Sequence, residues 1–146
     1  MITDKNLRVS TDQAVTATAV SSDTIDLSQA RDIGEGKDLY MNFAVTEAAT
    51  AAGAATVEFQ VIASDAAALS SPTVIGSSGA IAKTALTLGA NIAVRINPRI
   101  GSLGQRYIGA NYVVSTGPLT AGKFTADIVE TIQDGKKFYA SGFSVT

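Results

Sequence analysis

The sequence predicts an all-β sandwich or barrel, and two observations support this fold class. In several short runs, apolar residues alternate with polar ones, which is typical of a strand that buries one face. Turn signals separate these runs at regular intervals, and no long amphipathic helix lies between them. The 146 residues fit one domain, since a chain of this length buries about 70% of the surface that its unfolded form exposes.

We expect about eight antiparallel strands. The clearest is 38–46, in which Leu39, Met41, Phe43 and Val45 form one apolar face. The other expected strands are 24–27, 56–63, 73–75, 91–96, 106–115, 124–129 and 137–145.

The dipeptide Asp134-Gly135 fits a tight hairpin turn, because both residues tolerate positive φ. Its flanks, 129–132 and 138–145, would then pair antiparallel. Gly109 and Gly142 lie inside expected strands and indicate bulges or close backbone approach.

Four segments lack a strand pattern. Residues 1–20 have no clear period and predict an extended N-terminal arm before a domain of residues 21–146. The alanine-rich stretch 47–55 predicts a mobile loop tip. Segments 64–69 and 80–88 could form short helices, and ordered loops are the alternative for both.

Composition restricts the chemistry available to this chain. There is no cysteine, hence no disulfide or thiolate site, and no histidine, the commonest general base and transition-metal ligand. Charged residues make up 16% of the chain, fewer than in an average domain, and the net charge is −2 without a basic run. This pattern argues against nucleic-acid binding. The sparse charge indicates either a surface covered in an assembly or a merely bland one.

No apolar run is long enough for a membrane helix, and the first ten residues are polar and mixed in charge. We therefore expect a protein that is made in the cytoplasm and carries no secretory signal.

Paired carboxylates could in principle hydrolyse a glycosidic bond. However, Asp127 and Glu130 lie three apart on an expected strand and would point to opposite faces, and Glu58 has no acidic partner in sequence. Glu35 and Glu47 are the remaining candidates, and all five are expected to be solvated surface residues.

Two loop motifs were also considered. Residues 31–35 offer oxygen ligands but lack the alternating acidic spacing of a calcium loop. Residues 34–37 (Gly-Glu-Gly-Lys) lack the spacing of a phosphate loop and lead into a strand rather than a helix. We predict no catalytic residue, no metal site and no cofactor site, and hence a non-enzymatic protein.

Basic and aromatic residues at expected strand ends are candidate contacts with another protein or a second copy. Arginine and tyrosine favour interfaces, although solubilising charge and core-edge rings are the alternatives. The candidates are Arg31, Arg95, Arg99, Arg106, Tyr107, Lys136, Lys137 and Tyr139.

Several long stretches resemble the small jelly-roll capsid cement (decoration) proteins of tailed bacteriophages. The strongest resemblance is TIDLSQARDIGEGKDLYMNFAVT at 24–46. Later stretches are similar to the same family in the same order: ALTLGANIAVRI at 85–96, GQRYIGANYVVSTGPLTAGKFTADIV at 104–129 and DGKKFYASGF at 134–143.

The resemblance implies a jelly-roll β-sandwich that forms a homodimer on the outer surface of a phage head. There it would bridge neighbouring copies of the major capsid protein and stabilise the shell, without a cofactor. The alternative is a lectin-like, carbohydrate-binding jelly roll that uses Tyr40, Tyr107 or Tyr139 as sugar platforms, although the chain has no tryptophan. A hydrolase with two converging carboxylates is the third hypothesis.

Overall fold

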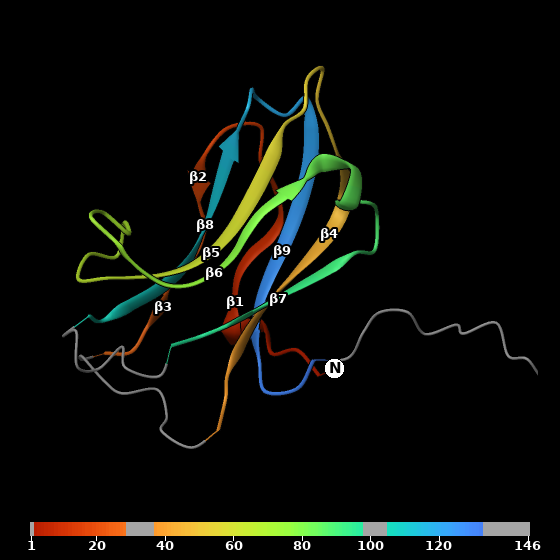
Figure 1. Cartoon of the computed structure of the whole chain (residues 1–146). Helices are drawn as coiled ribbons and strands as arrows, with labels where there is room; N and C mark the ends of the chain where they lie inside the picture. The colour runs from red at the N-terminus through yellow and green to blue at the C-terminus, as the bar shows by residue number, and fades with distance from the viewer. Residues whose placement is uncertain (1, 29–36, 98–104, 133–146) are drawn as a thin grey trace, which may run out of the picture.

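The structure is a computed structural model that describes residues 2–28, 37–97 and 105–132. These residues form two antiparallel sheets packed face to face, which confirms the predicted all-β sandwich (Figure 1). The elements are the 3-10 turns η1 (Lys5–Leu7) and η2 (Lys83–Ala85) and the strands β1 (Arg8–Ala14), β2 (Ala19–Val20), β3 (Ile25–Asp26), β4 (Tyr40–Thr50), β5 (Thr56–Ser64), β6 (Thr73–Ala82), β7 (Asn91–Arg95), β8 (Tyr107–Ser115) and β9 (Ala121–Val129).

The strand order is that of a jelly roll. One sheet, here called the four-stranded sheet, has the order β1-β9-β4-β7. The other, the five-stranded sheet, has the order β2-β8-β5-β6, with β3 also paired to β8. The pairs β1–β9, β2–β8, β4–β7 and β5–β6 are nested along the chain, so the sequence folds like one long hairpin wrapped into two sheets.

Strand alternation places the core where the sequence predicts it. Met41 pairs with Ile128, Phe43 with Ala126, and Val45 with Phe124, and all six side chains point between the sheets. The residues between them point outward, as the period of two requires.

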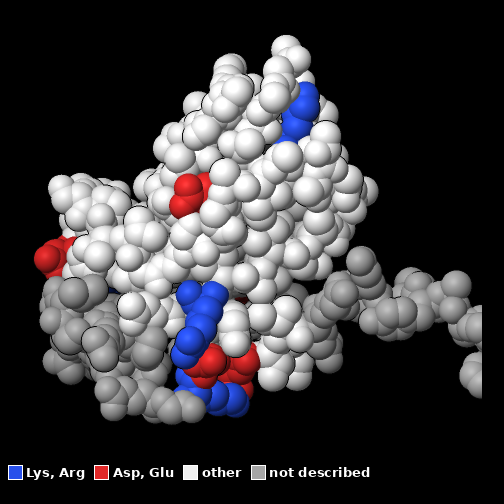
Figure 2. All heavy atoms as spheres, in the orientation of Figure 1, with Lys and Arg blue, Asp and Glu red and all other residues white. Residues whose placement is uncertain are grey.

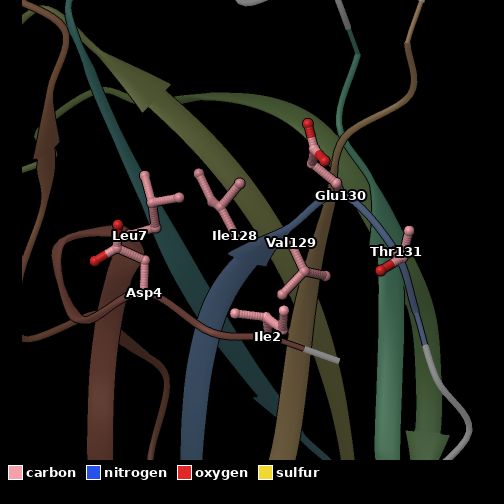
Figure 3. A pocket seen from close by; sticks show the side chains of 7 residues that line it. All are labelled: Ile2, Asp4, Leu7, Ile128, Val129, Glu130 and Thr131. Carbon is pink, nitrogen blue, oxygen red and sulfur yellow. The ribbon is translucent and has the colours of Figure 1, made fainter.

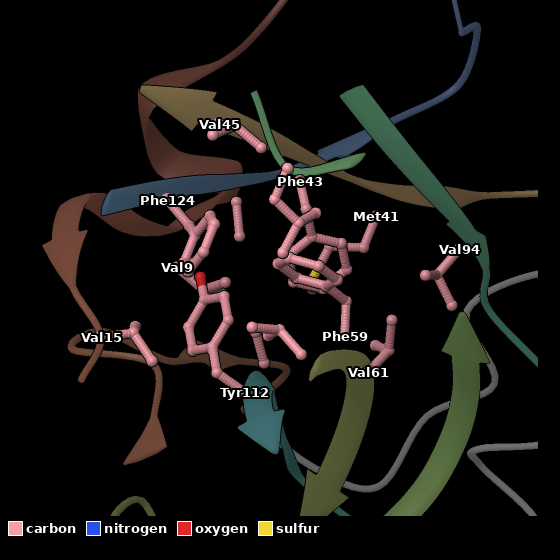
Figure 4. Close-up of a cluster of buried hydrophobic side chains, with 14 of the residues drawn as sticks. Val9, Val15, Met41, Phe43, Val45, Phe59, Val61, Val94, Tyr112 and Phe124 are labelled. Carbon is pink, nitrogen blue, oxygen red and sulfur yellow. The ribbon is translucent and has the colours of Figure 1, made fainter. Parts of the chain in front are cut away.

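Four aromatic rings fill the centre of the core: Phe43, Phe59, Tyr112 and Phe124 (Figure 4). Their centroids lie 5.1–5.9 Å apart in the pairs that contact, mostly edge to face, which is the favourable arrangement for aromatic pairs. The Tyr112 hydroxyl donates a hydrogen bond to Ser10 Oγ at 2.8 Å, and burial raises the pKa of Tyr112 far above its usual range. This bond links the two sheets, because Ser10 lies on β1 and Tyr112 on β8.

The predicted N-terminal arm is wrong from Arg8 onward. Residues 8–14 form β1 along β9, residues 19–20 form β2 along β8, and Val9 and Val15 are fully buried. The pattern was hidden because the pairing of β1 with β9 shifts register twice, between Arg8 and Ser10 and again before Gln13. A bulged strand loses the two-residue period that reveals an ordinary one.

The predicted loop tip at 47–55 is wrong for its first four residues, which belong to β4, whereas residues 51–55 form the connection to β5. β4 continues to Thr50, and Ala49 and Ala55 are buried. Gly122 of β9 lies against Ala49, and a Cβ on Gly122 would come within 3.5 Å of the Ala49 Cα, an ordinary contact distance. Part of the low-complexity stretch is therefore a packed strand end.

The two possible short helices are absent from the described residues. Segment 64–69 is the end of β5 followed by a turn, which agrees with the alternative prediction of an ordered loop. In segment 80–88, β6 runs to Ala82 and only the 3-10 turn η2 is helical. The strand at 137–145, the hairpin at Asp134-Gly135 and Gly142 lie outside the described residues. In the described ranges, no helix has the length and apolarity required to span a bilayer.

Candidate contact surfaces

Ion pairs gather at one end of the sandwich, where β4 and β8 begin and β7 and β9 finish. We call it the charged end; Figure 2 shows acidic and basic atoms together at one end of the visible face, with little charge above them. Three exposed pairs lie here: Arg95 with Asp38 at 2.6 Å, Lys37 with Glu130 at 3.1 Å, and Arg106 with Asp26.

Arg106 makes the most specific of these contacts. Its Nε and Nη2 donate to the two oxygens of Asp26 at 2.6 and 2.7 Å, and its guanidinium lies 5.1 Å from the centroid of the Tyr107 ring. The hydrogen bonds from Arg106 lower the pKa of Asp26, and those to Asp26 raise the pKa of Arg106. A bidentate, stacked arginine is held in one orientation.

Among the predicted contacts, the structure brings Arg95, Arg106 and Tyr107 to this end, on either side of 98–104. Arg31, Arg99, Lys136, Lys137 and Tyr139 lie outside the described residues. Both described arginines already hold a carboxylate, so a new acidic partner would have to exchange with Asp26 or Asp38. The guanidinium of Arg106 also covers the Tyr107 ring, which reduces its value as a sugar platform.

An apolar groove opens at the charged end between the two sheets. Its narrower part has a volume of about 250 Å³, and the adjoining part about 430 Å³. Leu7 of η1, Ile128, Val129 and Glu130 line both parts. Figure 3 shows Leu7 and Ile128 projecting to the same side, with the Glu130 carboxylate at the rim. We call this the end groove. The other lining residues are Ile2, Asp4, Ile25, Leu27, Leu39, Ile108 and Thr131.

The end groove could not be predicted from the sequence. The apolar character of Ile25, Leu27 and Leu39 was visible, but a strand pattern says only which face is buried. Which apolar residues remain open at the end of the sandwich depends on how the two sheets meet there.

The exposed face of the five-stranded sheet is almost free of charge. Strands β2, β5, β6 and β8 contain a single charged residue, Glu58. Its carboxylate accepts hydrogen bonds from Ser77 Oγ at 2.5 Å and Gln60 Nε2 at 2.9 Å, which lower the pKa of Glu58. Asn111 Nδ2 in turn donates to Gln60 Oε1 at 3.0 Å, so neutral polar groups continue across three strands. We call this surface the neutral face.

At one edge, the neutral face is covered by the segment that joins β5 to β6. Ile62 and Gly109 oppose each other on β5 and β8, and Leu69 lies over Gly109. A Cβ on Gly109 would collide with the Leu69 side chain and approach Ser21 Oγ to 2.9 Å. The close neighbours of Gly109 are side chains, so the structure shows tight side-chain packing there rather than the predicted bulge or close backbone approach.

The opposite exposed face, on the four-stranded sheet, is charged and paired. Arg8 Nε lies 2.6 Å from Asp127 Oδ1, and Lys123 Nζ lies 2.8 Å from Glu47 Oε2. The Asp127 side chain is only 5% exposed and lies against Arg8, so it is not the solvated surface residue that the sequence predicted. We call this surface the paired face.

The described carboxylates do not form a metal-type cluster. No group of three or more Asp or Glu residues close enough to hold a metal ion occurs in the part of the chain that the structure describes. Asp127 and Glu58 lie on different sheets, each in its own hydrogen bonds.

A protein-family model described as Bbp16 matches residues 9–128, from β1 to the end of β9. No curated protein matches the chain.

Proposed function

Because this chain belongs to the Bbp16 family, whose model covers both sheets of the sandwich, we propose that it is a structural protein of a tailed-phage head. It acts as a capsid cement protein: it binds the outer surface of the shell as a homodimer and bridges neighbouring major capsid subunits. The family name, which suggests a phage-related protein, and the jelly-roll fold support this assignment.

The neutral face is the observation that carries the proposal. Charged residues are depleted at the centres of protein interfaces, because burying an unpaired charge is costly. On strands β2, β5, β6 and β8 Glu58 is the one charged residue, and its carboxylate is already hydrogen-bonded. Asp26 of β3, in the same sheet, pairs with Arg106 at the charged end. The neighbours of Glu58 are small or neutral, so the surface can be covered with little loss of hydration.

Dimerisation gives a cement protein its strength. Two linked copies bind two sites on the shell, and the second contact forms at high effective concentration once the first is made. Each contact can therefore be weak while the pair holds firmly. A two-fold dimer also presents the same contact surface twice, which suits two equivalent capsid subunits.

The test is binding of the purified protein to mature phage shells that lack it, measured by co-sedimentation. We expect saturable binding and a higher temperature of shell disruption. Val113→Lys and Ala80→Glu, which add opposite charges to the neutral face, should weaken binding at least about thirtyfold, since a buried unpaired charge costs about 2 kcal/mol or more. Thr46→Lys, an exposed position on β4 in the four-stranded sheet, is the control and should bind normally.

Absence of any affinity of the unmodified protein for mature shells would sink the proposal. Normal binding by both neutral-face variants, with weakened binding by Thr46→Lys, would keep the function but move the contact to the paired face.

A further inference from the structure

The end groove is an apolar surface that the described residues leave open. Its narrower part is lined by seven apolar side chains and one carboxylate, Glu130. Six large apolar side chains of the described chain are notably exposed, and three of them belong to this region: Ile2 and Leu7 line the groove, and Ile132 follows directly after Thr131. Exposed apolar surface concentrated in one place indicates a binding site.

The C-terminal residues of the chain follow directly after the residues that line this groove. Thr131 is a lining residue, and the 14 residues from Gln133 to the C-terminus follow one residue later. This segment, QDGKKFYASGFSVT, contains three of the nine aromatic residues of the whole chain. Most of the other aromatic residues form the central core described above.

The sequence of the segment has the pattern of a strand with one apolar face. In an extended conformation Tyr139, Phe143 and Val145 would share one side, because side chains alternate along a strand. The predicted turn at Asp134-Gly135 would direct these residues back toward β9 and the groove. At about 3.3 Å per residue, distance does not limit this path.

We propose that the end groove binds the C-terminal segment of the same chain, with Phe143 inserted between Leu7 and the wall formed by Ile25 and Leu39. Charge complementarity supports this occupant. Lys136 and Lys137 precede the aromatic residues, and two exposed carboxylates lie on the groove: Asp4, which accepts a backbone hydrogen bond from Asn6, and Glu130, whose exposed partner is Lys37. The inference does not depend on the capsid function proposed above.

The absence of tryptophan from the chain provides a clean probe. Phe143→Trp in the full-length protein places a single indole on the segment. If the segment occupies the groove, tryptophan emission will be blue-shifted and quenching by acrylamide will be several-fold weaker than for a free tryptophan derivative. Adding Leu7→Ser should shift the emission to the red and restore quenching.

Val20→Ser is the matched control, since Leu7 and Val20 are both 38% exposed and Val20 lies on β2, which contributes nothing to the groove. It should leave the emission unchanged. Ile25→Ser tests the opposite wall and keeps the experiment decisive if Leu7→Ser perturbs the fold, which a thermal melt would reveal.

Two results would overturn the inference. One is solvent-exposed emission from Phe143→Trp that neither groove variant alters. The other is a blue shift that vanishes on dilution together with the dimer, because the groove would then hold the segment of a second copy. Either result can occur whether or not the protein binds phage shells, so this test is independent of the capsid test.

Discussion

The two sheets share one core but present opposite surfaces to the outside. Strands β1, β4, β7 and β9 carry six charged residues, Arg8, Asp12, Glu47, Arg95, Lys123 and Asp127. Strands β2, β5, β6 and β8, of nearly the same total length, carry only Glu58. The low overall charge of the chain is therefore not evenly distributed.

The two faces therefore differ in the free energy needed to bury them under a partner. A partner on the paired face would have to accommodate the two ion pairs Arg8–Asp127 and Lys123–Glu47, and covering them would remove water from several charges at once. The neutral face exposes hydroxyls, amides and small apolar groups, which can be covered at lower cost. Four predictions test the contacts that stabilise the two faces and the core between them.

The largest effect is expected on the paired face. Arg8→Ala leaves the buried Asp127 carboxylate without its ion-pair partner and should lower the free energy of unfolding by about 3 kcal/mol. Urea denaturation measures this change. Arg95→Ala, which removes an exposed pair with Asp38, is the control and should cost less than about 1 kcal/mol. Equal losses for the two variants would contradict the special role of Arg8.

The next effect concerns the covered edge of the neutral face. Gly109→Ala pushes the new methyl group into Leu69 and should destabilise the fold by about 2 kcal/mol. Gly53→Ala is the matched control, because its nearest neighbour is the Thr116 carbonyl oxygen at 3.8 Å, an ordinary contact. A melting temperature unchanged in both variants would show that the segment over Gly109 moves aside freely.

A smaller effect is expected at the bond that joins the two sheets. Tyr112→Phe removes the hydroxyl that donates to Ser10 and should cost about 1 kcal/mol. A double-mutant cycle with Ser10→Ala isolates the pair, since Ser10 Oγ also donates to Gln13 Oε1 at 2.8 Å. A coupling energy of zero would mean that packing alone connects the sheets here.

The smallest effect is the pH dependence of the neutral face. The hydrogen bonds from Ser77 and Gln60 hold the pKa of Glu58 below its usual 4.5, so its charged form adds stability above that pH. The contribution is lost as the pH falls through the folded-state pKa. Glu58→Gln should therefore be slightly less stable than the natural chain at neutral pH, by under about 1 kcal/mol, and the difference should shrink on acidification. A difference that grows toward low pH would reverse the assignment.

The fold class and most strands could be predicted from the sequence, because a strand with one buried face has an apolar residue at every second position. β4, β5, β7, β8 and β9 lie where alternation placed them. β1 was missed because its bulges break that period, and the end of β4 was missed because its small residues, with Ala49 packed against Gly122, resemble a low-complexity loop.

The contact surfaces were harder to foresee. The strand runs of Thr56–Ser64 and Tyr107–Ser115 are visibly poor in charge, but their adjacency in one sheet follows only from the pairing of β5 with β8. Arg95 and Arg106 were predicted as contact residues or solubilising charges, whereas the fold pairs them with Asp38 and Asp26 from distant positions. Partners separated by 57 and 80 residues leave no local signal.

The nested pairing of the strands also determines when the fold can close. The Arg8–Asp127 contact spans 119 residues, and β9 lies between β1 and β4 in its sheet. During synthesis, β1 therefore has no neighbouring strand to pair with in its sheet until β9 has left the ribosome. Local hairpins such as β5–β6 can form early, but closing so long a loop is slow, and the sandwich is completed only after the last strand arrives. A chain interrupted before β9 would expose both β1 and β4, which are the edges most prone to aggregate.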